Sequence, residues 1–103
     1  MSNRRITGVA LLEYEVAQER AATLGRLGRR LEEALAALRE HDAARQDSPT
    51  GSHGAARRQL VLEAGEALWY FVIQRELTGF HDSAAVMRDY RVPKEVQARM
   101  GVR

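Results

Sequence analysis

A single break in an otherwise helical sequence limits what this chain can fold into. The segment Asp47-Ser48-Pro49-Thr50-Gly51-Ser52-His53-Gly54 consists almost entirely of loop-forming residues, and its proline prevents a helix from continuing through it. On both sides of this segment, apolar residues recur every three or four positions, as they do on one face of an α-helix. The pattern predicts a helix at about 8–45, a flexible connector at 46–54 and a second helix at about 55–78. Two helices joined in this way form an antiparallel hairpin.

The first helical stretch carries a regular apolar stripe. Its members are Leu24, Leu27, Leu31, Ala34 and Leu38. This spacing keeps them on the side of the helix that faces a partner helix. Gly25 and Gly28 lie in the same region, where each costs about 1 kcal/mol relative to alanine. They mark either the close approach of another helix or a kink, and we favour close packing.

Two shorter helices are predicted after the hairpin, at about 82–90 and 93–100. Gly79 suits the end of the preceding helix, and Pro93 is tolerated in the first turn of the last one. The sequence contains neither strand-like alternation nor internal repeats. Residues 1–103 are therefore predicted to form one all-α domain.

The two long helices differ in length, because at about 1.5 Å per residue the first is on the order of 55 Å long. The second helix is expected to end beside about Ala21 and to leave Leu11, Leu12 and Val16 uncovered. The sequence therefore predicts that the two short helices pack on the start of the first helix. The apolar residues available for this contact are Phe80, Val86, Met87, Tyr90 and Val92.

The second helix contains two turns without a polar face, spanning residues 67–73. A helix that is apolar on all sides must be covered on all sides, and one neighbouring helix cannot do this. We therefore expect a homodimer in which two hairpins pair as a four-helix arrangement. The predicted interface consists of Trp69, Tyr70, Phe71 and Ile73.

Arg75 follows these apolar turns directly. In the antiparallel hairpin we expect it to face Glu15 or Glu19 of the first helix. A partly buried ion pair between these groups would fix the register of the two helices, which is a structural role and not a ligand site.

Several short motifs, distributed over nearly the whole chain, resemble those of a family of small bacterial all-helical proteins of unknown function. They are Leu12-Glu13-Tyr14-Glu15 with Gln18-Glu19, Leu24-Gly25-Arg26 with Gly28-Arg29-Arg30-Leu31-Glu32, Ala67-Leu68-Trp69, Gln74-Arg75-Glu76, and Arg88-Asp89-Tyr90-Arg91-Val92-Pro93 with Arg99-Met100-Gly101. The resemblance implies an all-α fold and a bacterial cytoplasmic setting. It implies no activity and assigns no catalytic or binding residue.

The polar residues do not form a recognisable chemical centre. The chain has no cysteine, which excludes a disulfide, a thiolate nucleophile and a cysteine zinc site. His41, His53 and His81 belong to no Glu-x-x-His or His-x-x-x-His motif, so we predict no metal site, no cofactor and no catalytic residue. The longest apolar run, residues 67–73, is too short to cross a membrane.

Three classes of function are compatible with these observations. The favoured one is a non-enzymatic, cytoplasmic helical protein that works in interaction or assembly, as an adaptor or regulator. The second is a nucleic-acid-binding regulator that uses residues 83–100 as a helix-turn-helix-like unit. Against it, the 16 basic residues are interleaved with 14 acidic ones, and the second helix of the unit is short for a groove reader. The third is an enzyme or small-ligand binder with a pocket near Tyr14, Arg75 and Tyr90.

Overall fold

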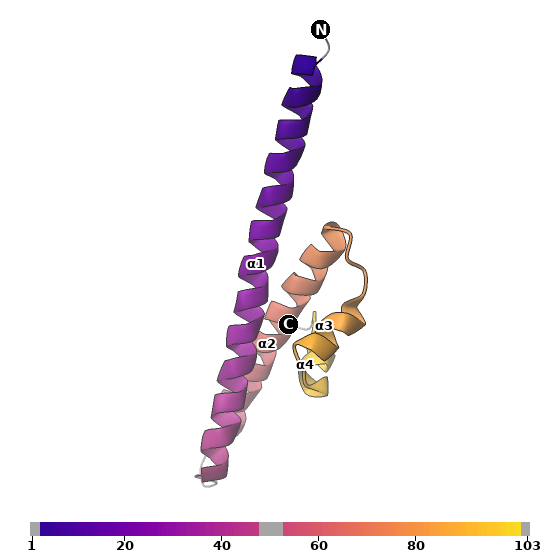
Figure 1. Ribbon diagram of the computed structural model, residues 1–103. Coiled ribbons are helices and arrows are strands. Elements are labelled where there is room, and N and C mark those ends of the chain that lie inside the picture. Colours follow the sequence, from indigo (N-terminus) through magenta and orange to yellow (C-terminus); the bar gives the residue numbers. More distant parts are fainter. Residues whose placement is uncertain (1–2, 48–52, 102–103) are drawn as a thin grey trace.

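The computed structural model describes residues 3–47 and 53–101. Four helices follow one another along the chain (Figure 1): α1 (Asn3–Asp47), α2 (His53–Leu77), α3 (Ser83–Asp89) and α4 (Lys94–Ala98). The all-α hairpin predicted from the sequence is confirmed: α1 extends beyond both of its predicted ends, and α2 begins two residues earlier and ends one residue earlier than predicted. Residues 48–52, which form most of the predicted connector, lie outside the described residues.

The core lies between the second half of α1 and the middle of α2. Leu31, Leu35 and Leu38 come from α1, which continues the stripe seen in the sequence. From α2 the main buried residues are Val61, Ala64, Ala67, Leu68, Phe71 and Val72. The register agrees with the predicted one, because Thr78 and Phe80 line the same shallow hollow as Ala17, Ala21 and Leu24.

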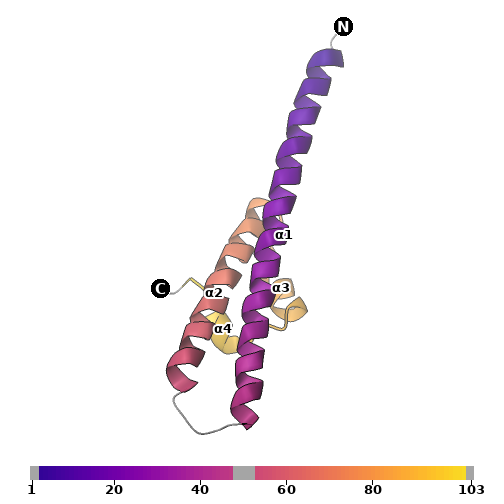
Figure 2. The ribbon, with the colours of Figure 1, turned by 90° about the vertical axis from the view of Figure 1, so that its left-hand side faces the viewer.

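The short helices cover the middle of the hairpin and not the start of α1, so this part of the sequence prediction was wrong. Val86, Val92 and Val96 are buried in the same core as Leu31 and Leu35. Figures 1 and 2 both show the first half of α1 projecting beyond α2, with α3 and α4 placed lower along the hairpin.

The turn after α2 explains why the short helices lie so far from the start of α1. Gly79 has a positive φ of 96°, and the amide of Phe80 donates to the carbonyl of Arg75 at 2.8 Å. These features define a Schellman ending, which reverses the chain direction. The chain therefore runs back along α2, where α4 packs, and does not extend toward Leu11 and Leu12.

The end of α3 repeats this geometry without a glycine. The amide of Val92 donates to the carbonyl of Met87 at 2.9 Å, and that of Arg91 donates to the carbonyl of Arg88 at 3.2 Å. Arg91, with a φ of 51°, occupies the left-handed position where most helices have glycine. A side chain in this conformation is strained, because its Cβ approaches the backbone too closely.

Two glycines allow close contacts with helix neighbours. A Cβ on Gly28 would lie 3.2 Å from the hydroxyl of Tyr90 and 3.3 Å from the ring of Phe71. One on Gly65, which the sequence analysis did not single out, would lie 3.0 Å from the backbone of Arg99. Gly25 has no such neighbour, since only the side chain of Arg29 comes within 3.4 Å. Close packing therefore explains Gly28 but not Gly25.

The two glycines of α1 should respond to substitution in opposite ways. Gly25→Ala should raise the free energy of unfolding by about 1 kcal/mol, because alanine is the better helix former and meets only a flexible side chain. Gly28→Leu should lower it by roughly 1–3 kcal/mol, because the added atoms overlap two rings. Urea denaturation of both variants measures the difference, and a loss of stability with Gly25→Ala would contradict the packing described here.

Arg91→Gly should stabilise the protein. Relief of the left-handed strain should raise the free energy of unfolding by roughly 0.5–1 kcal/mol. Arg88→Gly, inside the neighbouring helix α3, is the control and should lower it by about 1 kcal/mol. Thermal unfolding distinguishes the two, and equal losses would show that Arg91 is not strained.

Candidate functional site

The outer face of α2 carries apolar side chains that the rest of the chain covers only in part, since Arg30 lies over the ring of Tyr70 and Gly101 lies beside that of Trp69. Trp69 and Tyr70 are each more than a third exposed, and Leu77 is 67% exposed. Leu62 and Ile73 are half-buried. At about 100° per residue, Leu62, Trp69, Tyr70, Ile73 and Leu77 fall within about a third of the helix circumference, on one side of α2. We call this set the α2 seam.

The first part of α1 projects beyond the end of α2, and near its end Ala17 and Arg20 line a shallow hollow with Thr78 and Phe80. We call residues 7–20 the arm, because every one of them is exposed and both ribbon views show them projecting (Figures 1 and 2). The arm nevertheless carries large apolar side chains: Val9 is 58%, Leu12 61% and Val16 42% exposed. These three residues follow one another at intervals of three and four, so they share one side of α1.

The arm and the α2 seam belong to the same face of the molecule. The side of α1 that begins with Val9, Leu12 and Val16 continues at the same spacing to Arg30. The guanidinium of Arg30 lies 5.4 Å from the centre of the Tyr70 ring and 2.9 Å from the carboxylate of Glu66 on α2. We call this continuous surface the α1–α2 face.

The sequence prediction of an interface at Trp69, Tyr70, Phe71 and Ile73 requires one correction. Phe71 is only 4% exposed, because Tyr90 packs against it edge-to-face at 5.3 Å and Gly28 lies beside it. It therefore belongs to the core of a single chain. The sequence analysis did not anticipate that the end of α3 covers one side of the apolar turns. The other three residues lie on or beside the open side of α2.

Arg75 does not form the ion pair predicted with Glu15 or Glu19 among the described residues. Its guanidinium lies over the rings of Phe71 and Phe80, at 5.8 and 5.1 Å from their centres. Glu19 lies instead 3.7 Å from Arg26 on its own helix. In the observed register Arg75 comes level with about Leu24, so Glu15 is on the order of 13 Å further along α1. The side chain of Arg75 packs over the two rings and does not extend along α1.

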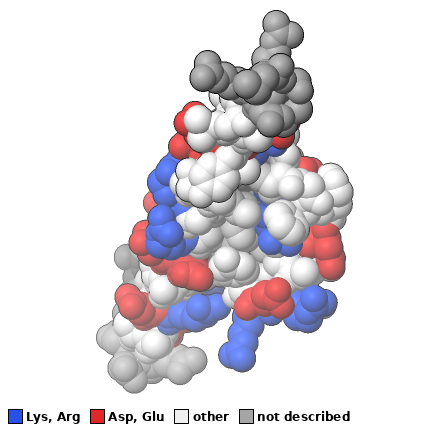
Figure 3. All heavy atoms as spheres, turned by 45° about the horizontal axis from the view of Figure 1, so that its top comes forward, with Lys and Arg blue, Asp and Glu red and all other residues white. Residues whose placement is uncertain are grey.

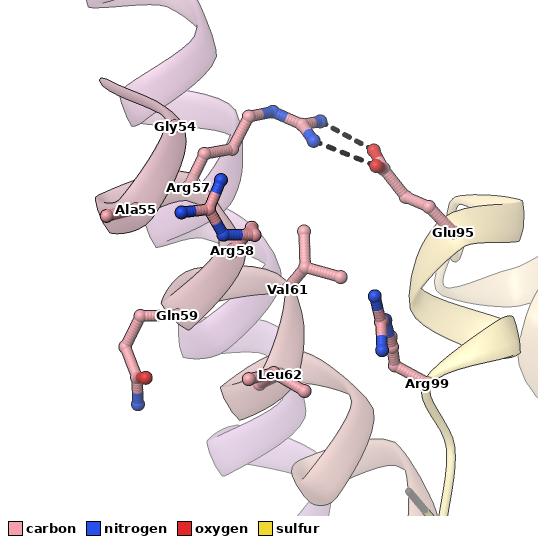
Figure 4. A pocket seen from close by; sticks show the side chains of 9 residues that line it. All are labelled: Gly54, Ala55, Arg57, Arg58, Gln59, Val61, Leu62, Glu95 and Arg99. Atoms are coloured by element: carbon pink, nitrogen blue, oxygen red, sulfur yellow. Dashed lines mark hydrogen bonds and ion pairs between the residues drawn. The ribbon is translucent and has the colours of Figure 1, made fainter. Parts of the chain in front are cut away.

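A second feature is an open hollow between α2 and α4, of about 650 Å³. Figure 4 shows Arg57 reaching across it from α2 to Glu95 on α4, with Arg58 and Arg99 at its border. Arg57 also donates to Asp42 of α1 at 2.8 Å, so one side chain joins three helices. Among the residues whose side chains the structure describes, no three potential metal ligands lie together.

The charges of this network depend on one another. Hydrogen bonds from Arg57 lower the pKa of Asp42 and of Glu95 below their ordinary values. The two carboxylates in turn raise the pKa of Arg57, so it stays protonated throughout the accessible range. Burial, in contrast, raises the pKa of the Tyr90 hydroxyl next to Gly28. Arg57 therefore has a structural role, because the N–H groups along both edges of its guanidinium already donate to protein carboxylates.

Replacing Arg57 should destabilise the protein in a pH-dependent way. At pH 7, Arg57→Ala should lower the free energy of unfolding by about 1 kcal/mol, a value reduced by the partial exposure of both carboxylates. Because the folded pKa of Asp42 and Glu95 lies below the unfolded value of about 4, their contribution is complete above that pH. It is lost as the pH falls through the folded pKa. Denaturation at pH 7 and pH 3, with Arg58→Ala as control, measures it; an equal loss at both pH values would contradict this structural role.

Comparison with known proteins extends these observations to the whole chain. Among the described residues, no helix is long and apolar enough to cross a membrane. Searches for similar curated proteins and for similar solved structures found no match. Residues 2–103 match the family described as a family of unknown function, DUF6665. The resemblance suggested by the sequence motifs is confirmed at the level of the family, and the chain is a member of this family of unknown function.

Proposed function

We propose that this protein is a non-enzymatic interaction protein whose working form is a homodimer that pairs through the α1–α2 face. The observation that carries the proposal is the exposure of Trp69, Tyr70 and Leu77 on the same side of the molecule as the uncovered Val9 and Leu12. An extended apolar surface of this kind is typical of a protein–protein contact.

The arm gives a physical reason for a partner. The packed half of α1 already supplies the helix nucleus, but most helical stability in proteins comes from packing of an apolar side, and the apolar side of the arm is exposed. Each apolar side chain that becomes fully buried contributes about 1.5–3 kcal/mol. A second copy supplies the required surface without any further component, because a two-fold contact uses the same patch on both chains.

The nucleic-acid alternative has weaker support. Val86, Val92 and Val96 hold α3 and α4 in the core, and α4 spans only 5 residues. A recognition helix requires a longer exposed side to reach base edges. On the face drawn in Figure 3, basic and acidic groups lie side by side around uncharged areas, without a broad basic field. The cytoplasmic location and a role as adaptor or regulator stay predictions from the sequence.

Two neighbouring leucines of the arm provide a matched test. Leu12 belongs to the α1–α2 face, whereas Leu11 is 57% exposed on another side of α1. We expect the unmodified protein to have twice the 11.6 kDa mass of one chain in light scattering at micromolar concentration. Leu12→Glu should weaken the dimer at least about tenfold, because it buries a charge, and Leu11→Glu should weaken it far less.

Two results would contradict the proposal. One is a mass of a single 11.6 kDa chain for the unmodified protein at tens of micromolar. The other is an equal effect of the two leucine substitutions, which would show that the α1–α2 face is not the contact. Circular dichroism of both variants checks that the helices are retained.

A further inference from the structure

We infer that the two copies pair antiparallel, with the two-fold axis crossing α1 near Thr23, so that the arm of each copy lies on the α2 seam of the other. This inference rests on the proposed homodimer and adds its geometry. The arm and the seam both carry exposed apolar side chains, and the antiparallel pairing covers both with the same contact.

The lengths of the two surfaces agree. At about 1.5 Å per residue, the arm measures about 20 Å and the seam from Leu62 to Leu77 about 22 Å. Along the long axis of the molecule, the seam begins where the arm ends, since α2 ends beside Ala21. Rotation about an axis near Thr23 therefore places the arm of one copy alongside the seam of its partner.

The side chains come to matching heights in this arrangement. With the axis near Thr23, Val16 of one copy lies level with Arg30 of the other. Arg30 lies under the ring of Tyr70 and pairs with Glu66, so this level of α1 is also the level of the α2 seam. Val16 therefore reaches the height of Tyr70 and Trp69 of the partner subunit, and Leu12 lies about 6 Å further along, one turn closer to Leu62 of the partner subunit.

The charges favour the antiparallel over the parallel orientation. On the shared side of α1, Glu19 lies on one side of Thr23, and Arg26 and Arg30 lie on the other. An antiparallel contact places Glu19 of each copy beside Arg26 of the other, where a second ion pair can add to the 3.7 Å pair within each chain. A parallel contact places glutamate against glutamate and arginine against arginine, and like charges in contact oppose binding.

The absence of cysteine from the sequence allows distances to be measured with single labels. Leu11→Cys and Ala22→Cys each place one spin label per chain on α1, outside the α1–α2 face, and both side chains are exposed. In the antiparallel dimer the labels at position 11 should lie at least about 35 Å apart, while those at position 22, near the axis, should lie within about 25 Å. Light scattering on the same labelled samples reports whether the chains are paired.

The outcomes separate the two proposals. A dimer with the long distance at position 11 and the short one at position 22 supports the inference. A dimer in which both distances are short is parallel, which overturns the inference and leaves the proposed homodimer intact. A monomeric mass for both labelled samples and for the unlabelled protein overturns both.

Discussion

The structure depends on the unequal lengths of its two long helices. Helix α1 has 45 residues and α2 has 25. The end of α1 and the beginning of α2 lie at the same end of the hairpin (Figure 1). The hairpin can therefore bury only the second half of α1, and the molecule extends over 75 Å in its longest dimension. Since α3 and α4 turn back along α2, Val9, Leu12 and Val16 of the arm stay exposed. Burial of these side chains by a second chain would add stability to the arm.

The short C-terminal helices have a different task, which is to complete the core of one chain. They add Val86, Val92 and Val96 to the layer formed by α1 and α2, and Gly65 lets the end of α4 approach α2 closely. Arg57 then joins α1, α2 and α4 through two carboxylates. These contacts hold one side of α2 inside the chain, and Gly101 after α4 also approaches the ring of Trp69. Leu77 and the outward part of Trp69 stay exposed.

The sequence predicted local structure better than it predicted contacts between helices. The break at Pro49, the apolar stripe through Leu31 and the ending at Gly79 were sufficient for the hairpin, since each is a local property. The place where α3 and α4 pack depends on the direction in which the chain leaves Gly79, and no pattern of spacing encodes that direction. The same difficulty applies to Phe71 and Arg75: an apolar run shows that a helix is covered, but not which of its residues the same chain covers. Gly65 was missed because a glycine in a helix gives no signal of which backbone approaches it.

Amide hydrogen exchange of the arm as a function of protein concentration tests the central claim most directly. If the arm is held by a second copy, the amides of residues 7–20 should be strongly protected at concentrations where the protein is dimeric. Their protection should fall on dilution, while the amides around Leu31 and Leu68, in the core of one chain, should exchange at unchanged rates. Protection of the arm that does not change with concentration, or an arm that exchanges freely in the most concentrated sample, would contradict the account.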